Sequence, residues 1–388
     1  MPAPIVIRNL TPETKMGNES PKIATREDLR SGARGDSGVV VPPGDAFSFG
    51  DAVLGGNFEN GVLTIETNTL DFTEKQNPNP LWYVDPGVEG TLSASPLSRL
   101  KVDLTGTPIG NLDTDVKYTS QGSARASFVG QAPSYSVPSS TLGPGRGDIL
   151  TNQYGAGDHI IVFSRYRRNF DGADAYAKWQ QLNPEASAWN IKRWRWWAAQ
   201  DPRNDIVFAY GQTPSEDGAP RITPERSMVG VYHTEPAGVD RALYGMKKNQ
   251  WVSELIELKQ SSDFDAADGL ARHIANGQEF VFPNVVTKNN DGEDGDYVQF
   301  VIEQWQFVYT DTPFNLWHDF FYLDDTPHAV IITDKPNWGD LNAVIDPAIP
   351  LSWSNSQITA KPRATLSGKY LYVKDGNGQM LNTVGVQL

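Results

Sequence analysis

From residue 53 onward, hydrophobic and polar residues follow the pattern that is typical of β-strands. Residues 62–67, Val-Leu-Thr-Ile-Glu-Thr, alternate with the period of a strand, and turn-forming Asn-Pro, Asp-Pro-Gly and Asn-Gly sequences separate the apolar runs. Few segments show helical periodicity, and the best helical candidate, residues 172–182, is short. The pattern therefore predicts an all-β protein with antiparallel sheets. The expected strands are residues 62–67, 81–84, 116–118, 125–129, 159–165, 205–210, 228–233, 251–258, 297–309 and 317–323.

Both ends of the chain differ from this middle part. Residues 11–44 are rich in Glu, Lys, Arg, Ser, Gly and Pro and lack sustained periodicity. After residue 329, further strand signals lead to an Asp-Gly-Asn-Gly turn at residues 375–378. We expect an extended N-terminal arm (1–47), a discontinuous β-module (48–79 plus 329–388) and a main domain (80–328). Free disorder is the alternative for the arm.

The charge and composition exclude several classes of protein. The chain has 33 Lys and Arg residues against 47 Asp and Glu residues, a formal net charge of −14, so nucleic acid and anionic membranes are not expected as partners. It has no cysteine, which excludes disulfides and thiolate metal sites. We also expect no signal peptide and no membrane span, because no apolar run approaches about 18 residues.

Two segments of the middle part resemble the concanavalin A-like jelly rolls of lectins, glucanases and polysaccharide lyases. Trp251-Val-Ser-Glu-Leu-Ile-Glu-Leu-Lys-Gln, followed by His273-Ile-Ala-Asn-Gly-Gln, is similar to a strand opened by Trp that precedes a hairpin ending in Asn-Gly. Trp317-His-Asp-Phe-Phe-Tyr-Leu-Asp-Asp is similar to a late strand of that fold, with its acidic pair. The resemblance covers roughly residues 80–325 and implies an antiparallel jelly-roll sandwich, a fold that does not by itself imply one function.

The two ends resemble parts of a smaller immunoglobulin-like module of the IPT/TIG family. Residues 352–360 and 368–378 are similar to the latter half of that module, and residues 62–72 take the place of its first strand. The glycine-rich motif that usually stands there is reduced to Phe72. The resemblance implies a jelly roll inserted into a split Ig-like module, a pairing found in uncharacterised phage and bacterial proteins.

Residues 191–197, Ile-Lys-Arg-Trp-Arg-Trp-Trp, are the strongest candidate for a sugar-binding surface. In a strand, alternation places Arg193, Arg195 and Trp197 on one face and the other two tryptophans on the opposite face. Arginines of residues 165–168 could add an anion-binding patch. The alternative is that both segments cover the edge of a core, with arginines stacked on tryptophans. The candidate sugar-binding residues are Arg165, Arg167, Arg193, Trp194, Arg195, Trp196 and Trp197.

No complete catalytic motif is present. A retaining glucanase of the resembled superfamily has a Glu-x-Asp-x-x-Glu run, which holds two carboxylates about 5 Å apart. Glu254 and Glu257 have odd spacing and are expected on opposite faces of a strand. The resemblance to lyases implies a Gln-x-His pair, a strand Arg and a late Tyr/Lys group, and the histidines are scattered singly, with His233 beside Tyr232 the one worth testing. We therefore expect no turnover of common polysaccharides.

A calcium site is the only cofactor that the sequence suggests. Residues 289–296, Asn-Asn-Asp-Gly-Glu-Asp-Gly-Asp, are dense in the hard oxygen ligands that Ca²⁺ prefers. Their spacing does not match an EF-hand loop, and a solvated hairpin tip is the alternative. A second acidic group is Asp319 with Asp324 and Asp325. The candidate metal ligands of the first group are Asp291, Glu293, Asp294 and Asp296.

The arm carries a short apolar, β-prone segment at each end, and these suit strand addition to a neighbouring subunit. The chain is accordingly interpreted as a non-enzymatic structural or appendage protein of a phage particle, located in the virion. Its expected partners are copies of itself, other particle proteins and surface glycans. The alternatives are a polysaccharide lyase or glycoside hydrolase with an unrecognised site, and a free bacterial glycan-binding protein. The expected assembly residues are Ile5, Val6, Ile7, Val39, Val40 and Val41.

Overall fold

The computed structural model is built almost entirely of antiparallel strands. The structure describes residues 5–8, 38–41, 47–48, 54–67, 72–105, 110–131, 159–169, 190–198, 204–210, 220–226, 248–263, 266–285, 297–306, 309–363 and 365–388. Within these ranges the one helix is α2 (Pro86–Glu89), and no helix is long and apolar enough to cross a membrane. The prediction of an all-β sandwich is therefore confirmed, while the helical candidate at 172–182 and the expected strand at 228–233 lie outside the described residues.

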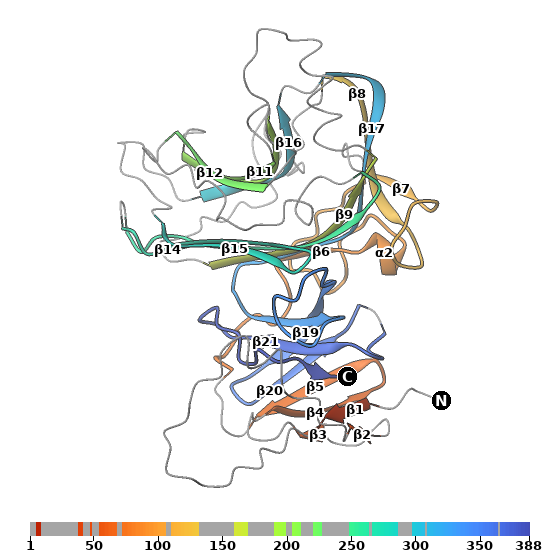
Figure 1. Ribbon diagram of the computed structural model, residues 1–388, viewed down its shortest axis with the longest axis vertical. Helices are drawn as coiled ribbons and strands as arrows, with labels where there is room; N and C mark the ends of the chain where they lie inside the picture. Colours follow the sequence, from red (N-terminus) through yellow and green to blue (C-terminus); the bar gives the residue numbers. More distant parts are fainter. Residues whose placement is uncertain are drawn as a thin grey trace. The chain divides into compact units, whose positions relative to one another are not determined.

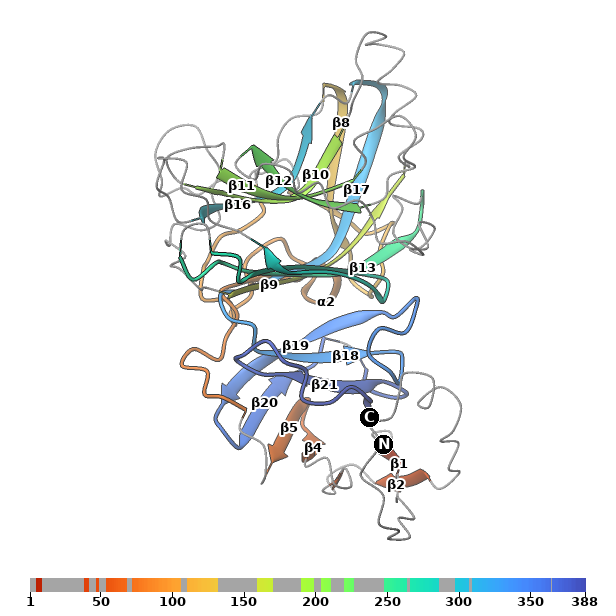
Figure 2. The ribbon, with the colours of Figure 1, turned by 60° about the vertical axis from the view of Figure 1, so that its left-hand side comes forward.

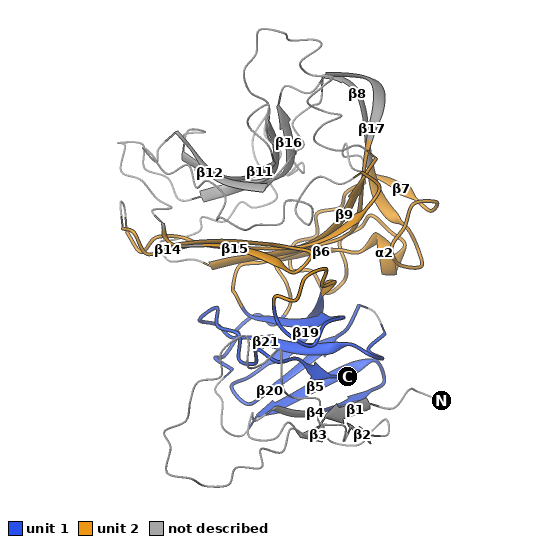
Figure 3. Ribbon diagram, in the orientation of Figure 1, with its two compact units in different colours: residues 1–78, 328–338, 346–388 blue, residues 79–327, 339–345 orange. Residues whose placement is uncertain are grey.

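The chain divides into two compact units (Figure 3). Unit 1 consists of Met1–Pro78, His328–Trp338 and Asp346–Leu388, and unit 2 of Asn79–Pro327 and Gly339–Ile345. Because the chain passes between the units more than once, neither unit is one continuous stretch of sequence.

Unit 2 contains an eight-stranded antiparallel sheet that brings together strands distant in the sequence (Figures 1 and 2). Its order is β15-β14-β13-β9-β17-β8-β7, with β6 paired to β17. Its strands are β6 (Trp82–Val84), β7 (Asn111–Asp113), β8 (Ser123–Gln131), β9 (His159–Arg168), β13 (Trp251–Lys259), β14 (Gly269–Ala275), β15 (Gln278–Val285) and β17 (Tyr309–Asp324). A four-stranded sheet of the same unit has the order β12-β11-β10-β16 and contains β10 (Asn190–Ala198), β11 (Asn204–Tyr210), β12 (Pro220–Arg226) and β16 (Tyr297–Gln306).

Local sequence explains where several of these strands end. Asn276 and Gly277 both have positive φ, of 47° and 77°, which is the two-residue turn that Asn-Gly favours between antiparallel strands. A Cβ at Gly277 would lie 1.8 Å from the carbonyl oxygen of Asp340, so only glycine fits there. Residues 116–118 were expected as a strand. Instead, the Asp113 carboxylate accepts hydrogen bonds from the amides of Asp115 and Val116, so this segment begins within a turn.

Unit 1 is built around a second eight-stranded sheet, with the order β22-β21-β18-β19-β20-β5-β4-β3. The expected pairing of residues 62–67 with the C-terminal region is confirmed, because Leu63 lies opposite Ala360 and Ile65 opposite Ile358. All four of these side chains are fully buried in one hydrophobic core. The strands are β3 (Phe47–Ser48), β4 (Leu54–Glu59), β5 (Val62–Thr67), β18 (Ala329–Thr333), β19 (Ile345–Trp353), β20 (Gln357–Lys361), β21 (Tyr370–Lys374) and β22 (Val386–Gln387).

The two apolar segments of the N-terminal arm pair with each other. Strand β1 (Ile5–Arg8) runs antiparallel to β2 (Gly38–Val41), with Ile5 opposite Val41 and Ile7 opposite Val39. The arm therefore forms its own two-stranded ladder within the chain. Its packing on a second subunit stays a prediction.

Candidate functional site

The register of the larger sheet in unit 2 separates its side chains into two faces. Successive residues of a strand point to opposite sides, and directly paired residues of neighbouring strands share a side. We call face A the side of Ser164, Tyr166 and Arg168 in β9, and face B the side of Arg165 and Arg167. The backbone of Ile345 lies against face B, where its carbonyl oxygen and amide are both 2.8 Å from the Ser253 hydroxyl.

Face A carries a buried carboxylate shared by a histidine and a serine. Nε2 of His273 in β14 lies 3.0 Å from Oε1 of Glu254 in β13, and Oγ of Ser164 in β9 donates to Oε2 of the same carboxylate at 2.8 Å. Glu254 and His273 are 1% and 2% exposed, and Ser164 is fully buried. The three side chains come from adjacent strands, because Glu254 pairs in register with both Ser164 and Ala275. A carboxylate on one imidazole nitrogen fixes the orientation of the ring.

Further polar side chains follow on the same face. Tyr166 stands two residues after Ser164 in β9 and is paired in register with His318 of β17. The guanidinium carbon of Arg168 lies 4.4 Å from the centre of the Tyr166 ring. All of these side chains are buried. Face A therefore brings a Glu–His pair, a phenol, a second imidazole and a guanidinium together along four neighbouring strands, β14, β13, β9 and β17. These are the groups that proton transfer beside a bound carboxylate requires.

Face B carries a second, separate Glu–His pair. Oε1 of Glu257 lies 2.6 Å from Nε2 of His159, and the other oxygen accepts from Arg272. Glu257 is fully buried, whereas the Arg272 side chain is 22% exposed. The prediction that Glu254 and Glu257 point to opposite faces agrees with this register, and the two carboxylates cannot act as an acid–base pair on one glycosidic bond.

Of the predicted sugar-binding residues, the structure describes the side chains of Arg165 and Arg167. Arg165 is 1% exposed and its NH1 lies 3.1 Å from the buried carboxylate of Asp319, so this arginine is held inside the protein. Arg167 is half-buried on face B. The backbone of residues 193–197 lies in β10, and its register with β11 shifts between Lys192 and Trp194, which leaves Arg193 as an extra residue in that pairing. A role of these residues in sugar binding stays a prediction.

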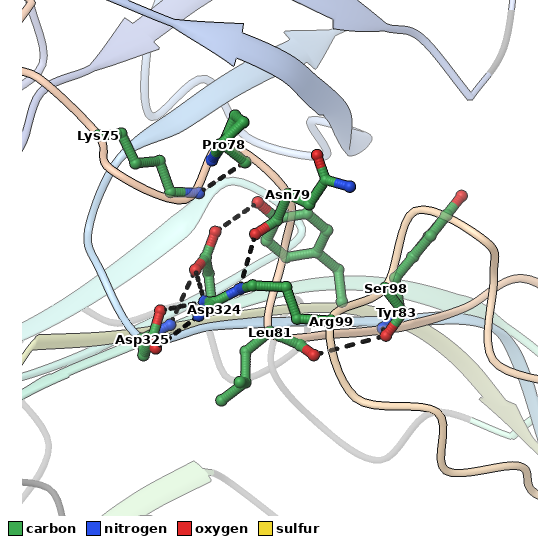
Figure 4. A network of polar contacts seen from close by, with 10 residues as sticks. Lys75, Pro78, Asn79, Leu81, Tyr83, Ser98, Arg99, Asp324 and Asp325 are labelled. Carbon is green, nitrogen blue, oxygen red and sulfur yellow. Dashed lines mark hydrogen bonds and ion pairs between the residues drawn. The ribbon is translucent and has the colours of Figure 1, made fainter.

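The predicted calcium ligands at 291–296 lie outside the described residues. The second acidic group is divided between two arginines. Asp319 pairs with Arg165, while Asp324 and Asp325 both bind Arg99 (Figure 4). Among the described residues no group of three or more His, Asp or Glu side chains could hold a metal ion.

The sequence interpretation missed the contribution of His273. His233, the histidine singled out for testing, lies outside the described residues, whereas His273 meets Glu254 from the next strand. The signal was present in the Asn-Gly hairpin after His273, which predicts a strand before it. What the sequence lacked was the register between β13 and β14, since the connection between them is not a two-residue turn.

No protein-family model and no curated protein matches the sequence. Solved structures do show a likeness. An endo-β-1,4-glucuronan lyase from the fungus Trichoderma reesei is 12% identical, with 64% of this chain and 96% of that chain covered and a TM-score of 0.36. Alginate lyase Aly36B in complex with an alginate tetrasaccharide is 15% identical (64% and 98% covered, TM-score 0.34), and alginate lyase vAL-1 from Chlorella virus is 12% identical (54% and 87% covered, TM-score 0.33). These likenesses concern the β-sandwich fold alone.

The comparisons correct the function predicted from the sequence. The similar solved structures named above are polysaccharide lyases, and a structural protein of a phage particle has no counterpart among them. The interpretation as a virion protein is therefore wrong. The physical reason for the error is that a missing sequence motif was taken as a missing site, although strands distant in sequence can assemble one.

Proposed function

We propose that this protein is a polysaccharide lyase that cleaves a uronate-containing glycan by β-elimination, with face A as its site. The observation that supports the proposal is the buried Glu254–His273 pair, which shares its face with Tyr166 and Arg168. In β-elimination, a base removes the proton at C5, next to the uronate carboxylate. The electron pair forms the C4=C5 double bond, the C4–O bond breaks, and the leaving oxygen takes up a proton.

Each group on face A has a role in this reaction. His273, oriented by Glu254, is the base, because a carboxylate partner stabilises the imidazolium that forms when the ring accepts the C5 proton. Tyr166 is the donor to the leaving oxygen. Arg168 stabilises the negative charge that develops on the uronate carboxyl group as the proton leaves.

The burial of the cluster sets a condition on this mechanism. Glu254, Tyr166 and Arg168 are each 1% exposed, so a sugar reaches them only by displacing the atoms that cover them. Binding therefore includes a conformational step, and turnover is expected to be slow relative to lyases with an open groove.

The test is the ultraviolet absorbance of the unsaturated uronate product, measured with a panel of alginate, glucuronan and pectate. We expect His273→Gln and Glu254→Gln to lower kcat about 100-fold or more, the usual contribution of a general base. Glu257→Gln is the matched control, since it removes a buried carboxylate from the same strand but from face B, and folded molecules of this variant should keep full turnover. Equal activity of His273→Gln and the unaltered chain would refute the assignment.

A glycan-binding protein without catalysis is the second candidate function. The near-complete burial of Glu254 and His273 supports the absence of catalysis, because a buried hydrogen-bonded pair also serves to specify the core. Calorimetric binding of a uronate oligosaccharide, with no unsaturated product after prolonged incubation, would favour this candidate over the lyase.

A further inference from the structure

Face B contains an arginine, Arg167, that forms no ion pair with an acidic side chain of the described residues. The Nε of Arg167 is buried and has no hydrogen-bond partner, and no ion pair joins this guanidinium to a carboxylate within the described ranges. Its guanidinium carbon lies 5.9 Å from the centre of the Trp317 ring. By contrast, Arg165 binds Asp319 and Arg125 binds Asp113 on the same sheet. The described part of the chain therefore offers this guanidinium no carboxylate, although the chain as a whole has a net charge of −14.

A tryptophan stands opposite Arg167 on each of the two neighbouring strands. Trp251 is paired directly opposite Arg167 in the register of β13 and β9, so both side chains emerge on face B. Tyr118 lies edge-to-face against Trp251, with ring centres 5.8 Å apart, and is 42% exposed. Trp317, on the other neighbouring strand, is also paired opposite Arg167.

Contacts with neighbouring side chains hold the rings of Tyr118 and Trp317 in place. The guanidinium carbon of Arg165 lies 4.0 Å from the centre of the Tyr118 ring, and Arg165 is itself fixed by the buried Asp319. Nε1 of Trp317 donates to Asp113 at 2.9 Å. Trp317 is buried, whereas Tyr118 is exposed, and an exposed ring immobilised in this way loses little side-chain entropy when a ligand binds to it.

We propose that Arg167, Trp251 and Tyr118 form a binding site on face B for an acidic sugar ring of a glycan chain, with the buried Trp317 supporting Arg167. Flat aromatic rings contact the apolar side of a pyranose, and a guanidinium forms charge-assisted hydrogen bonds with a carboxylate or sulfate group. A single such cation on an acidic protein does not suit a long polyanion such as nucleic acid. The site lies on the opposite face of the sheet from Glu254 and His273 and does not depend on the lyase proposal.

The experiment is a titration of the full chain with a tetrasaccharide of glucuronate units, in which binding is measured by calorimetry and by Trp fluorescence. Two further probes are compared with it. One is the same tetrasaccharide with its carboxyl groups reduced, which is neutral, and the other is a tetrasaccharide without carboxyl groups that carries sulfate. Arg167→Gln should raise the Kd for the glucuronate probe about tenfold and leave the weak Kd for the neutral probe unchanged, as expected for the loss of one charge-assisted contact. Tyr118→Ala should weaken the binding of all three probes. Arg125→Gln is the matched control, because this arginine already has Asp113 as partner, and its affinity should stay that of the unaltered chain.

Two further measurements make the result decisive. His273→Gln, which removes the proposed base on face A, should keep the Arg167-dependent binding, so failure of the lyase proposal and failure of the face B site give different results. If Arg167→Gln does not fold, as judged by circular dichroism, Tyr118→Ala decides instead. Unchanged affinity in the folded variants, or equal affinity for the acidic and neutral probes, would overturn the site. Preference for the sulfated over the glucuronate probe would identify sulfate as the acidic group.

Discussion

At the scale of single residues, Arg99 shows how one side chain satisfies two carboxylates. Its NH1 donates to Asp325 at 3.1 Å and its NH2 lies 3.2 Å from the fully buried Asp324 (Figure 4). Burial would raise the pKa of Asp325, but hydrogen bonds from Arg99 and its positive charge hold that pKa below its ordinary value. Burial, with the nearby Asp324 carboxylate, raises the pKa of Tyr322 well above its ordinary value, so its hydroxyl remains a donor to Asp324.

We predict that Arg99→Met lowers the free energy of unfolding at neutral pH by about 3 kcal/mol, because it leaves Asp324 buried without its cation. Since the pKa of Asp325 is lowered by folding, its stabilising contribution is present above the unfolded value, about 3.9, and is lost as the pH falls through the lower folded value. Urea unfolding between pH 2 and pH 7 measures this, and the variant should lose less stability on acidification than the unaltered chain. Parallel pH profiles would contradict the role of Arg99.

At the scale of elements, the bulge in β17 determines which groups the sheet can bury. The register between β17 and β9 shifts between His318 and Phe320, which leaves Asp319 as the extra residue. Its carboxylate binds Arg165 and accepts a hydrogen bond of 2.5 Å from the Thr119 hydroxyl. A bulge thus aims an acidic side chain at an arginine that regular alternation would leave buried without a counter-charge.

We predict that Asp319→Ala lowers the free energy of unfolding by about 3–5 kcal/mol, because it leaves the buried Arg165 cation without a counter-charge. The double variant Asp319→Leu with Arg165→Met should recover most of that loss, since a well-packed apolar pair avoids the desolvation of two charges. Thr119→Ala should cost about 1 kcal/mol, as expected for one hydrogen bond. Additive losses in the double variant, measured by chemical denaturation, would show that the two side chains do not interact.

At the scale of the whole molecule, unit 1 depends on segments from both ends of the sequence. Strand β5 pairs with β20, and Leu63 and Ile65 lie in the same core as Val330, Ile358 and Leu371. The C-terminal strands therefore cannot complete their core without the strand near residue 63.

We predict that Leu63→Ala destabilises unit 1 by about 2–5 kcal/mol, the usual cost of a cavity at a fully buried leucine. Amide hydrogen exchange should show the loss directly in Gln357–Lys361, far along the chain. Glu66→Ala on the same strand is the control, because this side chain is exposed and its removal should cost less than about 1 kcal/mol. Unchanged exchange in β20 of the Leu63 variant would contradict this coupling.

The local sequence by itself determined the class of fold and several turns. Alternating residues and Asn-Gly turns predicted an all-β chain, because side-chain period and the positive φ of Asn276 and Gly277 are decided by neighbours in sequence. The same alternation predicted that Glu254 and Glu257 lie on opposite faces of a strand.

Only the tertiary structure decided which strands meet. The pairing of Glu254 with His273, of Arg165 with Asp319, and of Arg167 with Trp251 each depends on a register between strands that no short turn connects. Register is set by burial of whole faces and by the bulge in β17, which are properties of the assembled sheet. Residues that meet only through strand register therefore leave no contiguous motif in the sequence.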